Sequence, residues 1–225
     1  MTRTTEAERR ARDLALSVSP SVSISISGSS TVPATQTLGA KLARGARVFG
    51  TIYGVLGAAA IANALTAGSF NQRFGLVPRD TSHVWGILLH PFLHVNASHL
   101  ALNAFGILML GGLTFLRDQR DFWRVALLGI LVGGSATWLV GRESLHVGAS
   151  GVVFAYLGYL LTTGWFDRKI GSILLSLSVA FLWGSALFGL SPLQKGISWE
   201  LHLFGLIGGI AGAWWRNRKL KSIGA

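Results

Sequence analysis

The chain has 225 residues, of which 50% are hydrophobic and 13% are charged. Soluble domains usually carry about 25% charged residues, so this composition excludes an ordinary soluble domain and favours a protein that crosses a membrane several times. The absence of cysteine excludes disulfides, thiolate nucleophiles and thiolate metal ligands. The net charge of +11 is spread between apolar runs rather than gathered in one basic module, so we do not expect the protein to bind nucleic acid.

The chain begins with a basic segment, 1–45, that is rich in Ser and Thr and has no sustained apolar run. Serines and Pro20 interrupt the stretch 14–26, which makes a cleaved signal peptide a poor match. We interpret 1–45 as a disordered tail. The membrane domain is then expected at 46–216, and 217–225 is interpreted as a second short basic tail.

Six segments have about the length that an α-helix needs to cross the hydrocarbon core of a bilayer, roughly 17–25 residues. They lie near 48–67, 98–116, 125–140, 148–166, 170–190 and 198–215. The connection 68–97 is long and contains an apolar patch, 84–89, that is too short to span the bilayer. The predicted fold class is therefore all-α: a polytopic bundle of six transmembrane helices with a long loop between the first two.

Basic residues indicate how this bundle is oriented. The loops on the side of both termini are rich in arginine and lysine, whereas those on the opposite side hold few such residues (Arg73, Arg79, Arg142 and Lys195). Positively charged loops stay in the cytoplasm, so both termini are predicted to be cytoplasmic. The tryptophans Trp214 and Trp215, next to Arg216, fit an anchor at the inner interface.

Four polar side chains fall near the outer ends of three predicted helices. Ser150 lies at the start of the fourth helix, His202 early in the sixth, and His99 and Asn103 early in the second. At a rise of about 1.5 Å per residue, all four share one depth in the membrane. A serine nucleophile needs a base to accept its proton, and histidine is the usual base. Asn103, His99 and the Ser150 backbone N–H could stabilise an oxyanion.

No carboxylate is placed to assist His202. Glu200 is two residues away on the same helix and should point elsewhere, toward the outer interface. We therefore predict a Ser–His dyad. The loop histidines His83 and His146 are interpreted as solvated.

Glycines predict close packing of the fourth and sixth helices. Gly148 and Gly151 flank the serine, and Gly205 and Gly209 form a G-x-x-x-G pattern on the sixth helix. In membranes such small faces allow two helix backbones to touch. This packing would hold His202 near Ser150.

Three motifs on three helices carry a resemblance to a known family. They are His99-Leu-Ala-Leu-Asn103, Gly148-Ala-Ser-Gly151, and His202-Leu-Phe-Gly205 with Gly209 following. Together they resemble the H-x-x-x-N, G-x-S-G and H-x-x-G-x-x-x-G motifs of the rhomboid family of intramembrane serine proteases. The stretches 74–78 and 90–94 are similar to that family's first outer loop. The resemblance covers about 48–215 and implies the bacterial six-helix form.

The resemblance implies that Ser150 is the nucleophile and His202 the base, with Asn103 and His99 in the oxyanion hole. It also implies that the substrates are transmembrane segments of single-pass proteins, that the bilayer is the environment, and that no cofactor is needed. The oligomeric state stays open. In two places the chain departs from the family: Leu201 stands where a small residue is common, and Phe154 where a tyrosine is frequent.

Other interpretations of the sequence compete with an intramembrane protease. A catalytically inactive rhomboid-like protein would bind membrane helices without cleaving them, and it would be expected to lack the Ser–His pair. A small transporter would need buried charges along a path, which the first, third and fifth helices hardly offer. A metal site on His90, His94 and His99 is disfavoured, because Pro91 breaks their helical spacing and no carboxylate is near.

Overall fold

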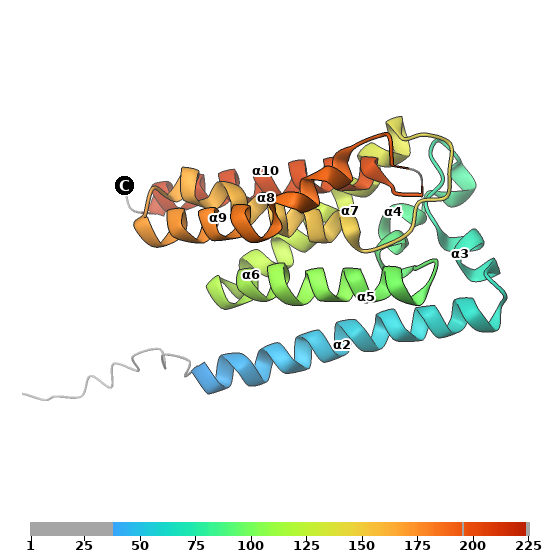
Figure 1. The fold of residues 1–225 in the computed structure, drawn as a ribbon, viewed down its shortest axis with the longest axis horizontal. Helices are drawn as coiled ribbons and strands as arrows, with labels where there is room; N and C mark the ends of the chain where they lie inside the picture. Colours follow the sequence, from blue (N-terminus) through green and yellow to red (C-terminus); the bar gives the residue numbers. More distant parts are fainter. Residues whose placement is uncertain (1–37, 195, 224–225) are drawn as a thin grey trace, which may run out of the picture. The chain divides into compact units, whose positions relative to one another are not determined.

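The computed structural model describes residues 38–194 and 196–223, and within these ranges the fold is entirely helical, without strands (Figure 1). In chain order the elements are α2 (Leu38–Leu65), α3 (Ser69–Phe74), η1 (Thr81–His83), α4 (Gly86–Leu89), η2 (His90–Phe92), α5 (Ala97–Gly106), η3 (Ile107–Gly111), α6 (Gly112–Arg117), α7 (Gln119–Val140), α8 (Ser150–Asp167), α9 (Ile170–Trp183), η4 (Gly184–Leu190) and α10 (Trp199–Ile223). The all-α prediction is confirmed for this part of the chain.

Four helical stretches are long and apolar enough to cross a membrane: 39–65, 97–117, 119–140 and 170–190. Large apolar side chains project from them without a protein partner to cover them; Ile61 is 62% exposed, Leu102 73% and Phe181 88%. Such surfaces are unfavourable in water and suit a hydrocarbon environment. The protein is therefore a multi-pass membrane protein, as its composition predicted.

The helix ends differ from the predicted ones in three places. The first helix begins at Leu38, so 38–45 are helical rather than part of a disordered tail. Its residues are mostly good helix formers, and Arg44 Nη1 donates to Gln119 Oε1 over 3.0 Å. The third helix begins at Gln119 rather than near 125, because the Asp118 carboxylate accepts from the Arg120 N–H and caps it. The last helix runs on to Ile223, through most of the predicted second tail. Residues 1–37 lie outside the described ranges.

The helix α8 forms the centre of the bundle. Every residue from 151 to 160 is buried, which is typical of a helix surrounded by others rather than lying at a surface. Aromatic rings join it to its neighbours: the Phe122 ring of α7 stacks on Tyr156 with centroids 5.3 Å apart, and Phe122 also meets Phe49 of α2 edge to face at 5.6 Å. The candidate serine at its start is thus attached to the best-packed element.

Backbone contacts join α8 and α10. A Cβ atom added at Gly205 would lie 2.1 Å from the Gly151 carbonyl oxygen, and one added at Gly209 would lie 1.9 Å from that of Ala155. Only hydrogen atoms fit between the two helices at these points. The close approach brings the start of α8 beside the first turns of α10.

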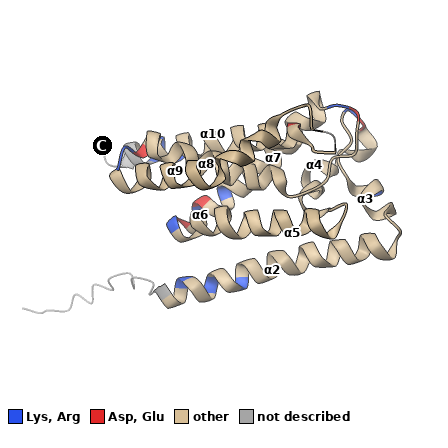
Figure 2. Cartoon of the chain, in the orientation of Figure 1, with Lys and Arg blue, Asp and Glu red and all other residues tan. Residues whose placement is uncertain are grey.

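Charged residues lie mainly at the ends of the helices (Figure 2). At the end opposite Ser150, Arg216 forms an ion pair with Asp121 at 2.7 Å and another with Asp167 at 2.9 Å. Asp121 also accepts a hydrogen bond from Tyr159 Oη at 2.7 Å, and Arg117 pairs with Asp167. This arginine–aspartate network joins α6, α7, α8 and α10 at that end.

Candidate active site

Ser150 is the first residue of α8 and is partly buried. The first hydrogen bonds of the helix are donated by Val152 and Val153, both to the Ala149 carbonyl, over 2.9 and 3.0 Å. The N–H groups of Ser150 and Gly151 precede both donors, so neither has an acceptor within the helix. Both add to the positive end of the helix dipole. The start of α8 is therefore suited to hold a negatively charged oxygen close to the serine hydroxyl.

The turn before Ser150 depends on Gly148. Its φ angle of 121° lies in the region that only glycine adopts readily, and its N–H donates to the His90 carbonyl over 2.8 Å. A Cβ atom at this position would lie 2.6 Å from His99 Cε1 and 3.3 Å from Asn103 Nδ2. Hence His99 and Asn103, both on α5, lie against the turn that leads into Ser150.

Asn103 presents a donor at this turn. The residue is buried, and its Nδ2 has no hydrogen-bond partner among the described residues. A buried donor without an acceptor is costly, and such groups in native structures often mark a place that a ligand atom occupies. The position of His99 is set locally, because the Asn96 side chain accepts from the His99 N–H over 2.8 Å and caps α5.

His202 is oriented by two contacts. Its ring stacks on Phe154, with centroids 4.1 Å apart and planes 8° from parallel. Its Nδ1 lies 2.9 Å from the Gly189 carbonyl oxygen of η4. Because a carbonyl can only accept, Nδ1 carries the proton in this bond, and Nε2 of the neutral ring is left as the free acceptor.

Gly189 permits this arrangement. A Cβ atom there would lie 3.1 Å from His202 Nδ1 and 3.2 Å from Phe154 Cζ. Phe154 follows Ser150 by one helical turn, so the two occupy one face of α8. The stacked His202 ring is thereby held over the face that carries Ser150. Among the described residues no hydrogen bond joins the Ser150 hydroxyl to His202, and such bonds are often loose in unliganded enzymes.

Glu200 and His146 differ from their predicted positions. Glu200 is 2% exposed rather than facing the interface, and its Oε1 accepts from the Arg142 N–H over 3.2 Å. His146 is 1% exposed rather than solvated, because its backbone pairs with Leu76 through bonds of 3.1 and 2.8 Å that draw the loop inward. Burial lowers the pKa of the His146 imidazole and favours its neutral form.

The remaining loop histidines have structural contacts. His83 Nδ1 lies 2.7 Å from Asp80 Oδ2, so its ring belongs to a small cap rather than being free in solvent as predicted. His90 Nδ1 donates to the Gly86 carbonyl over 3.0 Å. The His94 ring meets His99 edge to face, with centroids 5.1 Å apart. Burial lowers the pKa of both His90 and His94 to about 4.

Comparison with known proteins identifies the family. Residues 81–219 match the Rhomboid domain. The chain belongs to the rhomboid family. Uncharacterised proteins of Mycobacterium tuberculosis and Mycobacterium bovis are each 37% identical to it over 167 residues, which is 67% of this chain and 69% of theirs. The rhomboid protease GlpG of Haemophilus influenzae is 30% identical over 138 residues, 57% of this chain and 68% of its own.

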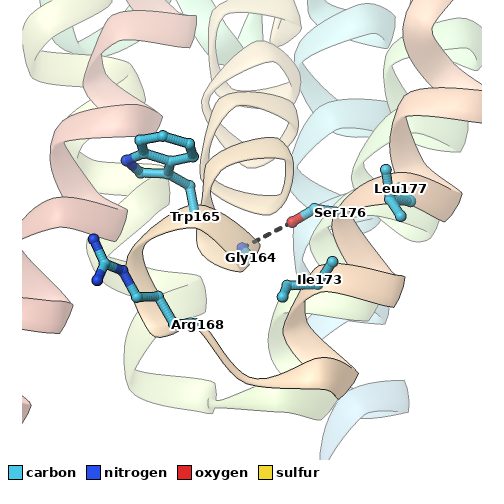
Figure 3. Close-up of a pocket in the computed structure, with 6 residues that line it drawn as sticks. All are labelled: Gly164, Trp165, Arg168, Ile173, Ser176 and Leu177. Carbon is cyan, nitrogen blue, oxygen red and sulfur yellow. Dashed lines mark hydrogen bonds between the residues drawn. The ribbon is translucent and has the colours of Figure 1, made fainter.

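This rhomboid domain also has a groove at the opposite end from Ser150. It has a volume of about 480 Å³ and lies between the end of α8 and the start of α9 (Figure 3). Ser176 and Gly164 both line it, and the Ser176 hydroxyl oxygen accepts from the Gly164 N–H over 2.9 Å. Gly164 is about 20 Å along α8 from Ser150 at the usual helical rise. The groove is therefore separate from the candidate active site.

Proposed function

We propose that this rhomboid family member is an intramembrane serine endopeptidase with a Ser150–His202 dyad. The observation that carries the proposal is the orientation of His202. Its ring is stacked on Phe154, one turn from Ser150, and its Nδ1–H is bound to the Gly189 carbonyl. This leaves His202 Nε2 free to act as a base, next to the face of α8 that carries Ser150.

The reaction starts when the Ser150 hydroxyl attacks the carbonyl carbon of the scissile peptide and His202 Nε2 accepts the hydroxyl proton. The tetrahedral oxyanion is stabilised by the Ser150 N–H, Asn103 Nδ2 and the His99 ring. His202 then donates its proton to the departing amine, which leaves an acyl ester on Ser150. A water molecule, deprotonated by His202, hydrolyses the ester and restores the serine.

The Gly189 carbonyl takes the place of a carboxylate. In serine peptidases with a triad, the carboxylate holds the histidine in the correct tautomer and stabilises the imidazolium. The Gly189 carbonyl accepts from Nδ1–H at 2.9 Å and performs the first task. The dipole of this carbonyl also helps to stabilise the imidazolium, although it carries less negative charge than a carboxylate. The buried Glu200 carboxylate bonds Arg142 instead of the imidazole.

The substrates are transmembrane segments of other membrane proteins, cut in or near the bilayer. A spanning helix has its carbonyls hydrogen-bonded internally and is protected from attack, so cleavage should favour segments that unwind readily. In this proposal all six predicted segments span the membrane and both termini are cytoplasmic. The arginine-rich end of the bundle supports this orientation, which places Ser150 near the outer face.

The test is cleavage of a single-pass substrate by purified protein in liposomes. Ser150→Ala and His202→Ala should each abolish cleavage, and a fluorophosphonate probe should label the wild-type protein but not Ser150→Ala. Ser178→Ala, an exposed serine of α9, and His83→Ala serve as matched controls and should cleave normally. Cleavage that survives in Ser150→Ala would refute the proposal. An inactive helix-binding protein would bind the substrate without cleavage or labelling in any variant.

A further inference from the structure

Two loops meet at the candidate active site. One, 141–149, connects α7 to Ser150. The other, described over 191–194 and 196–198, leads from η4 into α10 and His202. Glycine contacts fix α8 against α10 from Gly151 onward. The serine itself lies at the junction of loop and helix, where a helix frays most readily. Its position relative to His202 therefore depends also on how the two loops are held together.

The first contact is an ion pair between the 141–149 loop and Glu200 at the start of α10. Glu200 Oε1 accepts from the Arg142 N–H at 3.2 Å and lies 3.4 Å from Arg142 Nε. Arg142 Nη2 also donates to the Ile197 carbonyl. The Glu200 side chain is only 2% exposed, while that of Arg142 is 40% exposed. A buried carboxylate requires a partner, so Arg142 is held at the start of α10.

The second contact is a histidine–serine bond. His146 Nδ1 bonds to Ser198 Oγ, and His146 Nε2 lies 3.1 Å from the Arg142 carbonyl oxygen. His146 precedes Ser150 and Ser198 precedes His202 by the same number of residues. The bond thus joins the two chain segments at the same number of residues before each reactive side chain.

We propose that these contacts form a clasp, Arg142–Glu200 with His146–Ser198, that sets the position of Ser150 relative to His202. Glu200 is then a positioning residue that acts through Arg142. The inference rests on the proposed peptidase function and adds to it a role for four residues outside the reaction itself. Misplacement of reacting groups by about 1 Å can cost roughly 100-fold in rate, so loosening the clasp should slow acylation while leaving substrate binding intact.

The experiment compares Glu200→Gln with Glu143→Gln. Both remove one negative charge next to Arg142, but Glu143 is 86% exposed and outside the clasp. We expect Glu200→Gln to lower kcat at least about fivefold with KM unchanged and to slow fluorophosphonate labelling by a similar factor. Glu143→Gln should match the wild type. Arg142→Gln should resemble Glu200→Gln, and the double variant should be no slower than the slower single variant, because both remove one interaction.

All rates are measured well below the melting temperature of each variant. Equal labelling rates for Glu200→Gln and Glu143→Gln would overturn the proposal, as would a lower melting temperature without a lower kcat. If Glu200→Gln does not fold, Ser198→Ala tests the other contact, and an unchanged kcat there also overturns the clasp. Cleavage by Ser150→Ala would instead mean that the proposed function fails, so the two failures are distinguishable.

Discussion

Replacing Gly205 by alanine would place a Cβ atom 2.1 Å from the Gly151 carbonyl oxygen, 2.8 Å from its carbon and 3.0 Å from its Cα. All three are backbone atoms, which cannot rotate away as a side chain would. A carbon–oxygen contact normally needs about 3.3 Å, so α10 would have to move from α8 by roughly 1 Å at this point.

The displacement acts directly on the proposed dyad. Gly205 lies less than one helical turn after His202, and Gly151 follows Ser150. Overpacking of this kind costs about 1–3 kcal/mol of stability, which lowers the melting temperature of a protein of this size by several degrees. A shift of about 1 Å between nucleophile and base can cost roughly 100-fold in rate. We expect the loss of activity to exceed what the loss of stability explains.

The assay is the rate of substrate cleavage in liposomes, together with thermal unfolding of each variant. The matched control is Gly212→Ala on the same helix. A Cβ atom at Gly212 would meet only the tips of Leu128 and Val125, at 3.2 and 3.3 Å, and these side chains can shift. Gly212→Ala should therefore cleave at close to the wild-type rate. The reasoning is refuted if Gly205→Ala cleaves and unfolds like the control.

Three further predictions concern other parts of the molecule. Asn103→Ala should lower kcat about 100- to 1,000-fold with little change in KM, because it removes a donor to the oxyanion; a change confined to KM would contradict this role. Asp121→Asn should lower stability by about 3 kcal/mol, because Arg216 loses a buried partner; thermal unfolding should show the loss, with cleavage at low temperature retained. The pKa of about 4 for buried His90, against about 6.5 unfolded, means that the unfolded state binds the proton first on acidification. Stability should therefore fall between pH 6.5 and 4, by up to about 3 kcal/mol from this group, and unfolding of His90→Gln should be less dependent on pH over that range.

The positions of the helices could be predicted because the thickness of the bilayer sets the length of an apolar segment. The resemblance singled out Phe154 as the position where a tyrosine is frequent, and the structure shows its ring stacked on His202. The first and last residues of the helices were harder to predict. The first helix begins at Leu38 because helix formation continues beyond the apolar run, and no sharp change in residue preference marks its first turns.

The contacts between loops could not be predicted from the sequence. His146 was expected in solvent because a polar residue in a loop usually lies there, but its backbone pairing with Leu76 draws it inward and its ring bonds Ser198. Nothing in the spacing indicated that Glu200 would bond Arg142, since the partners are far apart in the chain. The role of Gly189 was hidden for another reason: the contact uses a backbone carbonyl, which every residue has.

The five-residue π-helix η3 has a consequence for changes in chain length. At its end the Gly112 N–H contacts the carbonyls of Ile107, Leu108 and Met109, as expected where one extra residue is accommodated in a turn. The helical segments on either side, α5 and α6, stay rotationally aligned because this turn accommodates the extra residue. Deleting one residue within η3 should therefore leave Asn103 facing α8, whereas deleting one between Asn103 and η3 would turn Asn103 by about 100° relative to α6. The second predicted membrane segment, formed by α5, η3 and α6, can therefore change its length at η3 without rotating Asn103 relative to α6.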